Sequence, residues 1–305
     1  MNLVALSLTQ YYEAYAEHPI VFGSEKFITL NADKAQDIVA LSLINDKQKH
    51  VAGMIIGQRD SNTFACPFSA PFGEICCDES ISIETLQIFF REVKAWLAGR
   101  TLHLVLPPTV YNDNLVSKIV AAALPVTRNA YFDLSYHYET ERVVDFKTHL
   151  HRSARYNFNR AQRTDFVFHE TDDLARAYEV IRINREQRGY YLSMSLQQVL
   201  DTAERAVHVD AFVLSHGDVD VASALVFAVA PHVVQVVYWG DNPEYSHLHA
   251  MNVLPYRIFK HYHNAGVRIV DIGTAHLQNL QPNIPLAAYK ESIGCTTTLK
   301  PTLEI

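Results

Sequence analysis

Cysteine is scarce in this chain and is not spaced for metal or redox chemistry. The 305 residues contain four cysteines, and no two of them form a Cys-x-x-Cys pair. Adjacent Cys76 and Cys77 would point to opposite faces of a strand, and Cys66 and Cys295 stand alone. We therefore expect reduced thiols, as is typical of a cytosolic protein.

Long apolar runs and an excess of positive charge are also missing. No run approaches the roughly 18 apolar residues that a membrane helix needs. Residues 1–10 lack the basic start and the cleavage site of a signal peptide. The net charge is −7 with neutral histidine. We expect a cytoplasmic protein without membrane insertion, which would hold a polyanion such as tRNA only through a local basic patch.

Patterns typical of metal or covalent catalysis are absent too. His247 with His249, and His261 with His263, are two residues apart, so on a helix their side chains diverge by about 200°. Neither a His-Glu-x-x-His nor a Gly-x-Ser-x-Gly motif occurs, and Cys76 has no histidine near it in the sequence. We expect no metal site and no covalent intermediate, which leaves direct attack on a bound donor.

What the sequence does contain is one order of elements that occurs twice. The spacing of apolar residues predicts a helix over 82–97, ended by Gly99 and followed by a buried strand over 101–106. The same order recurs with a helix over 249–263, Gly266 and a strand over 267–273. We expect an α/β fold with a mixed sheet and a duplicated unit, with domains at 1–140 and 141–305.

Three further segments carry a resemblance to a known family. They are the arginine-rich helix over 150–161, the polar loop Gly240-Asp241-Asn242, and Tyr289-Lys290-Glu-Ser-Ile-Gly294. Together with the element order, these segments resemble the FemAB-like transferases of the GNAT (acetyltransferase-like) superfamily. The resemblance implies two GNAT-like domains in tandem, with the active groove in the C-terminal one.

The resemblance also implies a function. An acyl or aminoacyl group would pass from an activated anionic donor, aminoacyl-tRNA or acyl-CoA, to an amine acceptor that is a small molecule or a peptide. No cofactor would be bound tightly, and a role in cell-wall or polysaccharide metabolism is implied. The loop over 239–249 has one glycine and two acids, which argues against the standard binding of acetyl-CoA.

The candidate site residues follow from these motifs. Lys290 would stabilise developing charge, and Asp271 or Asp241 would accept the proton. The donor-binding candidates are Arg152, Arg155 and Arg163, and the acceptor-binding candidates are Tyr238, Trp239 and Tyr289.

Several alternatives stay open at this point. The arginines can form an ordinary solvated helix face, and Lys290 can be an ordinary surface lysine beside Glu291. Asp271 lies inside an apolar strand, so it needs either an ionic partner or a role as a base. A non-catalytic protein that binds a sugar or a peptide on the same fold would also have this sequence pattern.

Overall fold

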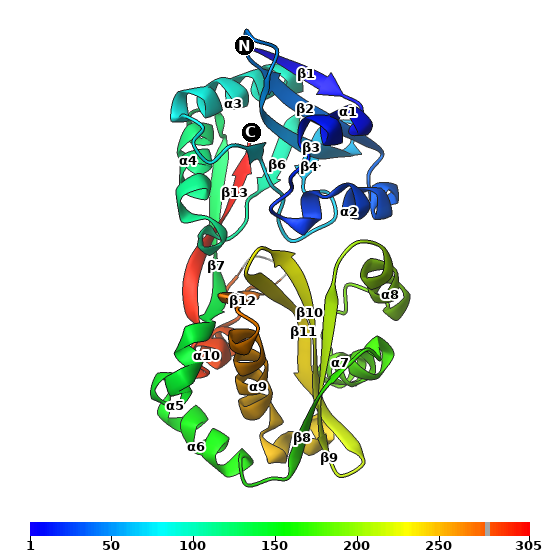
Figure 1. Ribbon diagram of the computed structural model, residues 1–305, viewed down its shortest axis with the longest axis vertical. Helices are drawn as coiled ribbons and strands as arrows, with labels where there is room; N and C mark the ends of the chain where they lie inside the picture. The colour runs from blue at the N-terminus through cyan, green and yellow to red at the C-terminus, as the bar shows by residue number, and fades with distance from the viewer. Residues whose placement is uncertain (278–280) are drawn as a thin grey trace. The chain divides into compact units, whose positions relative to one another are not determined.

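The computed structural model describes residues 1–277 and 281–305. The chain forms two compact units (Figure 1). The first unit comprises Met1–Leu134 and Thr298–Ile305, and the second comprises Ser135–Thr297. Two strands contribute residues to both units, β7 (Asn129–Glu139) and β13 (Thr296–Glu304). No helix in the described ranges is both long enough and apolar enough to cross a membrane.

The first unit is a mixed sheet with helices on both faces. Its strands follow the order β1-β2-β3-β4-β6-β13, and β5 pairs with β3. Buried residues of α3 and α4 form a large core on one face, and α1 and α2 cover the other. The bounds are β1 (Asn2–Leu6), β2 (Asp37–Ile44), β3 (His50–Asp60), β4 (Thr63–Cys66), β5 (Cys76–Cys77), β6 (Thr101–Val105), α1 (Leu8–Ala14), α2 (Glu25–Leu30), α3 (Ile83–Leu97) and α4 (Asp113–Ala123).

The helix α3 forms where the sequence predicts it, for local reasons. The Ser82 hydroxyl accepts the hydrogen bond of the Thr85 amide, which caps the first turn. Apolar residues at helical spacing, including Phe89 and Phe90, are fully buried in the core. Gly99 follows the end of the helix with φ +92°, a conformation that glycine adopts without strain.

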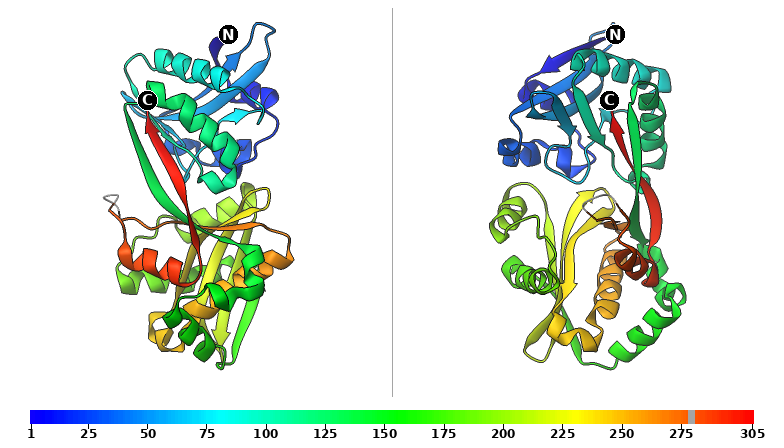
Figure 2. Two further views of the ribbon diagram at one scale, coloured as in Figure 1. Left: turned by 90° about the vertical axis from the view of Figure 1, so that its left-hand side faces the viewer. Right: turned by 180° about the vertical axis from the view of Figure 1, so that it is seen from behind.

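The second unit is also a mixed sheet, in the order β7-β12-β11-β10-β9-β8. Figures 1 and 2 show α9 on one face of this sheet, with α7 and α8 on the other. The bounds are β8 (Phe166–Thr171), β9 (Val209–His216), β10 (Val219–Ala230), β11 (Val233–Asp241), β12 (Ile269–Thr274), α5 (Phe146–His149), α6 (Arg152–Ala161), α7 (Leu174–Arg188), α8 (Leu196–Arg205), α9 (Ala250–Asn264) and α10 (Ile284–Ser292). Short 3-10 helices cover Val21–Gly23, Ala32–Lys34, Thr109–Tyr111, Leu124–Val126, Thr140–Asp145 and Pro243–Leu248.

Aromatic packing fixes α9 on its face of the second sheet. The ring of Phe259 stacks on Tyr138 of β7 at a centroid distance of 3.9 Å. Phe146 and Phe158 pack against Tyr256, which brings α5 and α6 onto the same helix. These contacts bury the apolar side of the arginine-rich helix and leave its other side to solvent.

The duplicated element order is confirmed. In the first unit, β4 leads through α3 to β6, which pairs with β4 in parallel. In the second unit, β11 leads through α9 to β12, which pairs with β11 in parallel. A parallel pair needs such a crossover helix, because the chain must return to the start of the neighbouring strand.

Candidate functional site

The two parallel strands of the second unit separate soon after they pair. β11 and β12 are paired over Val233–Gln235 and Ile269–Asp271. Beyond this, β11 continues to Asp241 beside β10, while β12 continues to Thr274 beside β7. We call this divergence of the two strand ends the fork.

Two β-bulges accompany the fork. The register between β10 and β11 shifts between Leu225 and Val226, which makes Val237 the extra residue of β11. The register between β12 and β7 shifts in the same way at Ile272. A bulge bends its strand and increases the local twist. Ile272 directly follows Asp271, and Val237 lies two residues after Gln235, so the bulges give a local cause for the separation.

Asp271 lies at the point where the fork begins. Its side chain is 1% exposed. Oδ2 accepts a hydrogen bond from Gln235 Nε2 at 2.8 Å, and Oδ1 accepts from the Gly273 amide at 2.8 Å. Ser135 Oγ donates to Oδ1 at 3.4 Å. These donors offset the cost of burying a carboxylate and fix its orientation.

Lys290 is buried beside the end of β12 and is not on an open surface. Its side chain is 3% exposed, and Nζ donates to the carbonyl oxygens of Ile272, Gly273 and Thr274 at 2.8, 2.9 and 2.8 Å. An ammonium has three N–H donors, and here each of them has an acceptor. Burial lowers the pKa of Lys290 to about 8, while the charges of Cys295 and Asp271 oppose this shift.

The neighbouring residue of α10 contacts the other strand of the fork. The ring of Tyr289 packs on Trp239 of β11, with the two centroids 6.1 Å apart and the planes at 75°. The Tyr289 hydroxyl donates to the Met251 carbonyl of α9 at 2.9 Å. Consecutive residues Tyr289 and Lys290 therefore reach β11 and β12, so α10 braces the fork.

Tyr238, a further candidate from β11, lies apart from this group. The Tyr238 side chain faces α7 and α8, and its hydroxyl hydrogen-bonds to Ser193 and to the Met194 amide. Trp239 lies on the α9 face, because successive strand residues point to opposite faces. The structure thus brings Trp239 and Tyr289 together and separates them from Tyr238.

Asp241 is held by α7 and by the loop that follows β11. Its carboxylate accepts hydrogen bonds from Asn184, Arg188 and Ser246 at 3.0, 3.0 and 2.9 Å. Asn184 also donates to the Asp241 carbonyl at 2.7 Å. Of the two candidate proton acceptors, Asp271 is at the start of the fork, while Asp241 anchors the end of β11 to its neighbours.

The donor-binding candidates Arg152, Arg155 and Arg163 are exposed, and among the described residues none of them makes an ion pair. At 100° per residue, Arg152, Arg155 and Arg160 share an arc of about 140° on α6 with Tyr156, which is 68% exposed, and Arg163 lies in the turn after the helix ends at Ala161. We call this surface of α6 the arginine face. Its opposite side is buried against α9.

The start of α6 lies beside the end of α10. The His151 amide donates to the Ser292 carbonyl at 3.0 Å. An open hollow of about 490 Å³ is lined by Arg152, Ser153, Tyr156 and Asn157. One end of the arginine face therefore adjoins the helix that carries Tyr289 and Lys290.

Sequence reasoning missed the residues that shape the fork. Gln235 and Ser135 orient Asp271, and the bulges at Val237 and Ile272 separate the strands. One signal was available, because Gln235 is a polar residue in an otherwise apolar strand, as Asp271 is in its own. A bulge has no comparable signal in a single sequence.

Comparisons with known proteins give one family model and several solved structures that resemble this chain. The family model described as an acetyltransferase (GNAT) domain matches residues 146–291, which include α6, the fork and most of α10. No curated protein sequence matches the chain. The fold is similar to that of several solved structures at low sequence identity.

Three structures illustrate this similarity over nearly the whole chain. FemX matches with a TM-score of 0.66 at 9% identity, covering 99% of this chain and 97% of that chain. L-PGS from Bacillus licheniformis matches with a TM-score of 0.58 at 12% identity, covering 97% and 90%. A tandem GNAT protein from the clavulanic acid biosynthesis pathway matches with a TM-score of 0.52 at 10% identity, covering 100% and 98%.

These matches bear out the expected fold class, a mixed α/β architecture of two GNAT-like domains. The sequence match is confined to the unit with the braced fork, and the structural match extends over both units. Residues 146–291 therefore match a GNAT acetyltransferase domain, and the whole chain has the tandem GNAT-like fold of FemX.

Proposed function

We propose that the protein transfers an acyl or aminoacyl group from an activated anionic donor to an amine, and that the reaction takes place at the fork. The observation that carries this proposal is the separation of β11 and β12 with a buried carboxylate at its start, inside the segment that matches a GNAT domain. In this fold, donor and acceptor meet where the central strands separate.

The chemistry proposed is direct attack. The amine nitrogen attacks the donor carbonyl carbon, and the carbonyl carbon loses its bond to the sulfur of a thioester or to the ester oxygen of an aminoacyl-tRNA. The proton of the amine passes to the Asp271 carboxylate, and the thiolate or tRNA alkoxide that leaves takes this proton from Asp271 to become the thiol or the hydroxyl. Gln235 and the Gly273 amide hold that carboxylate, which is what a positioned base requires.

We assign Lys290 a positioning role in this reaction, because its three donors are taken by carbonyl groups. By holding the carbonyls of residues 272–274, the ammonium keeps the end of β12 away from β11. Trp239 and Tyr289 would then form one wall of the acceptor site, since they pack on each other at the fork.

The arginine face supports an anionic donor. Four exposed arginines in a chain of net charge −7 form the local basic patch that a phosphate-bearing donor needs. The exposed ring of Tyr156 among them suits stacking on a base, as in the adenine of coenzyme A or a nucleotide of tRNA. Both donors share phosphate and base, so binding experiments have to distinguish them.

A thermal-shift and fluorescence screen of the full chain tests the proposal. The probes are a panel of acyl-CoA thioesters, a non-hydrolysable aminoacyl-tRNA analogue and free tRNA. A donor that binds wild type, and binds at least about tenfold more weakly to an Arg152→Gln/Arg155→Gln variant, supports transfer. Lack of binding by every donor, in protein shown to be folded, would overturn it.

One observation favours a second function. The rings at the fork and the Lys290 ammonium are engaged with neighbouring groups, which also suits a non-catalytic protein that binds a sugar or a peptide. Binding of muropeptides or oligosaccharides without turnover of any bound donor would favour this alternative. A context in cell-wall or polysaccharide metabolism is compatible with either function.

A further inference from the structure

The first unit contains a buried group of side chains that the proposed transfer does not use. Three residues with metal-ligand atoms, His18, Glu74 and Cys76, converge from the connection between α1 and the 3-10 helix Val21–Gly23 and from the segment before and within β5. The side chains of His18 and Glu74 are 8% and 7% exposed, and Cys76 is buried. Among the described residues, these three side chains are the group whose metal-ligand atoms all lie within 4.8 Å of one another.

The three ligand atoms form a small triangle. Cys76 Sγ lies 3.4 Å from His18 Nδ1 and 3.3 Å from Glu74 Oε1, and His18 Nδ1 is hydrogen-bonded to Glu74 Oε1. A tetrahedral zinc ion with Zn–S near 2.3 Å and Zn–N or Zn–O near 2.0 Å separates its ligand atoms by roughly 3.3–3.6 Å. Both sulfur distances fit this range, and the contact between Nδ1 and Oε1 would open on binding.

The arrangement does not suit a nucleophilic cysteine. In a Cys-His-acid triad the thiol and the carboxylate contact different nitrogens of the imidazole. Here both contact Nδ1, while Nε2 is buried and has no hydrogen-bond partner among the described residues.

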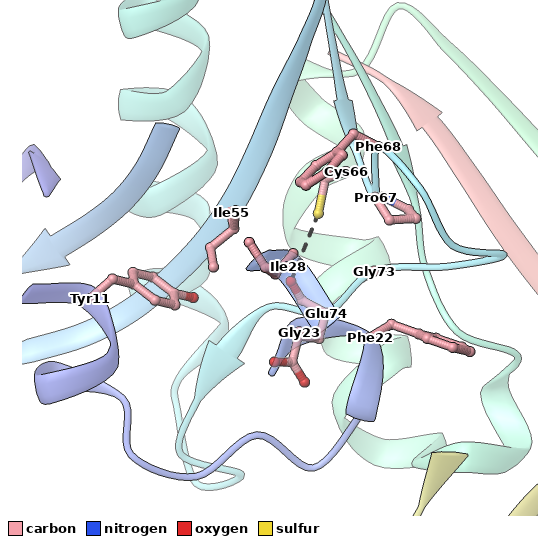
Figure 3. Close-up of a pocket in the computed structure, with 10 residues that line it drawn as sticks. All are labelled: Tyr11, Phe22, Gly23, Ile28, Ile55, Cys66, Pro67, Phe68, Gly73 and Glu74. Atoms are coloured by element: carbon pink, nitrogen blue, oxygen red, sulfur yellow. Dashed lines mark hydrogen bonds between the residues drawn. The ribbon is translucent and has the colours of Figure 1, made fainter. Parts of the chain in front are cut away.

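Neighbouring groups hold the ligand side chains in place. The Ile20 amide donates to the second oxygen of Glu74 at 3.1 Å. Gly23 leaves room for the carboxylate, because a Cβ there would come within 1.9 Å of Oε1. A cavity of about 20 Å³, lined in part by Tyr11 and Glu74, has space for a water molecule (Figure 3).

We propose that His18, Glu74 and Cys76 bind a divalent transition metal, zinc in the first instance, with a water as the fourth ligand. Thiolate, imidazole and carboxylate are the ligand types of protein zinc sites, and three protein ligands with a water is a known coordination. Zinc binding displaces the thiol proton of Cys76, so it offsets the burial cost of the thiolate. The site lies in the first unit and does not depend on the transfer reaction.

The test uses the full chain after treatment with a chelator. Zinc chloride is titrated by calorimetry, and cobalt chloride is titrated in the spectrophotometer. We expect one zinc ion per chain and a thiolate-to-cobalt charge-transfer band in the near ultraviolet. Cys76→Ser and His18→Gln should each bind zinc at least about a hundredfold more weakly, because even a residue outside the ligand set costs about 10–100-fold.

Two control variants keep the test decisive. Cys77→Ser removes the adjacent thiol, which contacts the Ile75 carbonyl, and should leave zinc affinity and the cobalt band unchanged. Gly23→Ala keeps every ligand but displaces Glu74, so it should weaken zinc binding. The proposal is overturned if folded wild type binds no zinc, if Cys76→Ser binds zinc as wild type does, or if Cys77→Ser alone loses the band.

Discussion

Each unit contains a parallel strand pair joined by a crossover helix, but the two pairs differ in how far the first strand extends beyond the pairing. In the first unit β4 ends at Cys66, where its pairing with β6 also ends. In the second unit β11 continues from Gln235, its last residue paired with β12, to Asp241. The fork therefore belongs to the second unit, although both units have the same crossover.

Matching positions make the contrast sharper. Leu104 lies five residues after Gly99, and Asp271 lies five residues after Gly266. Leu104 is a fully buried apolar residue, whereas Asp271 is a buried carboxylate held by hydrogen bonds. The first unit thus has an ordinary core residue at the position where the second unit has its candidate base.

The next residue along each strand, Val105 or Ile272, has a carbonyl group with a different kind of hydrogen-bond donor in each unit. The Val105 carbonyl accepts a hydrogen bond from the backbone amide of Gly73 at 2.9 Å. The Ile272 carbonyl accepts from Lys290 Nζ at 2.8 Å. A loop of the main chain satisfies the strand end in the first unit, and a buried ammonium does so in the second.

The largest effect is expected from removing that ammonium. Lys290→Met leaves three carbonyl groups without their donor, and an unsatisfied buried acceptor costs about 1–3 kcal/mol. We expect the free energy of unfolding to fall by about 3 kcal/mol or more, measured by urea denaturation. Lys260→Met, an exposed change on α9, should stay within about 0.5 kcal/mol of wild type. A loss below about 1 kcal/mol for Lys290→Met would contradict the bracing role.

Asp271→Asn tests the difference in chemistry. The amide keeps the size of the side chain but does not accept a proton, so we expect kcat with the identified donor to fall by at least about a hundredfold. Asp241→Asn is the matched control, because it weakens the contact with Arg188 and leaves the fork intact. Equal losses of kcat in the two variants would remove Asp271 from its role as the base.

Gly73→Ala tests the loop that closes the equivalent place in the first unit. The added Cβ would lie 2.7 Å from Cys66 Sγ and 3.1 Å from the Pro67 nitrogen. Crowding of this kind typically costs about 1–3 kcal/mol, which thermal unfolding would measure. Donor affinity should not change, and a change in it would mean that the first unit also contributes to donor binding.

The arginine face should give a smaller effect, on binding alone. Arg152→Gln/Arg155→Gln should weaken donor binding by at least about tenfold, which corresponds to about 1.4 kcal/mol. The difference from wild type should shrink as salt rises, because these side chains are exposed. The buried side of α6 is unchanged, so stability should hold. Unaltered affinity would identify α6 as a solvated surface helix.

The smallest expected effect is a pH dependence of stability. The pKa of Lys290 is about 8 in the folded chain, against 10.5 for an ordinary lysine. Between these values the unfolded chain retains the proton that the folded chain has lost, so the contribution of Lys290 to stability rises with pH. Between pH 8 and pH 9, the free energy of unfolding of wild type should rise by about 1 kcal/mol relative to that of Lys290→Met, as measured by urea denaturation. No change in this difference would mean that the carbonyl groups keep the amine protonated.

Several predictions from the sequence are confirmed because they rest on local patterns. The helix after Ser82, the glycine ends and the repeated crossover follow from the spacing of apolar residues and from caps within a few residues. The arginine face was also predictable, since residues three and four apart share one side of a helix. The roles proposed for Arg152, Arg155 and Arg163 stay predictions.

The sequence by itself thus determined the elements, their order, and the polar residues placed in apolar strands, because these depend on neighbours along the chain. The tertiary structure decided what those residues contact. The bulges at the fork depend on pairing with β10 and β7, and three backbone carbonyls determine what Lys290 binds. His18 meets Cys76 across 58 positions of sequence. Only folding brings such distant groups together, since nothing in the local pattern of either residue specifies the other.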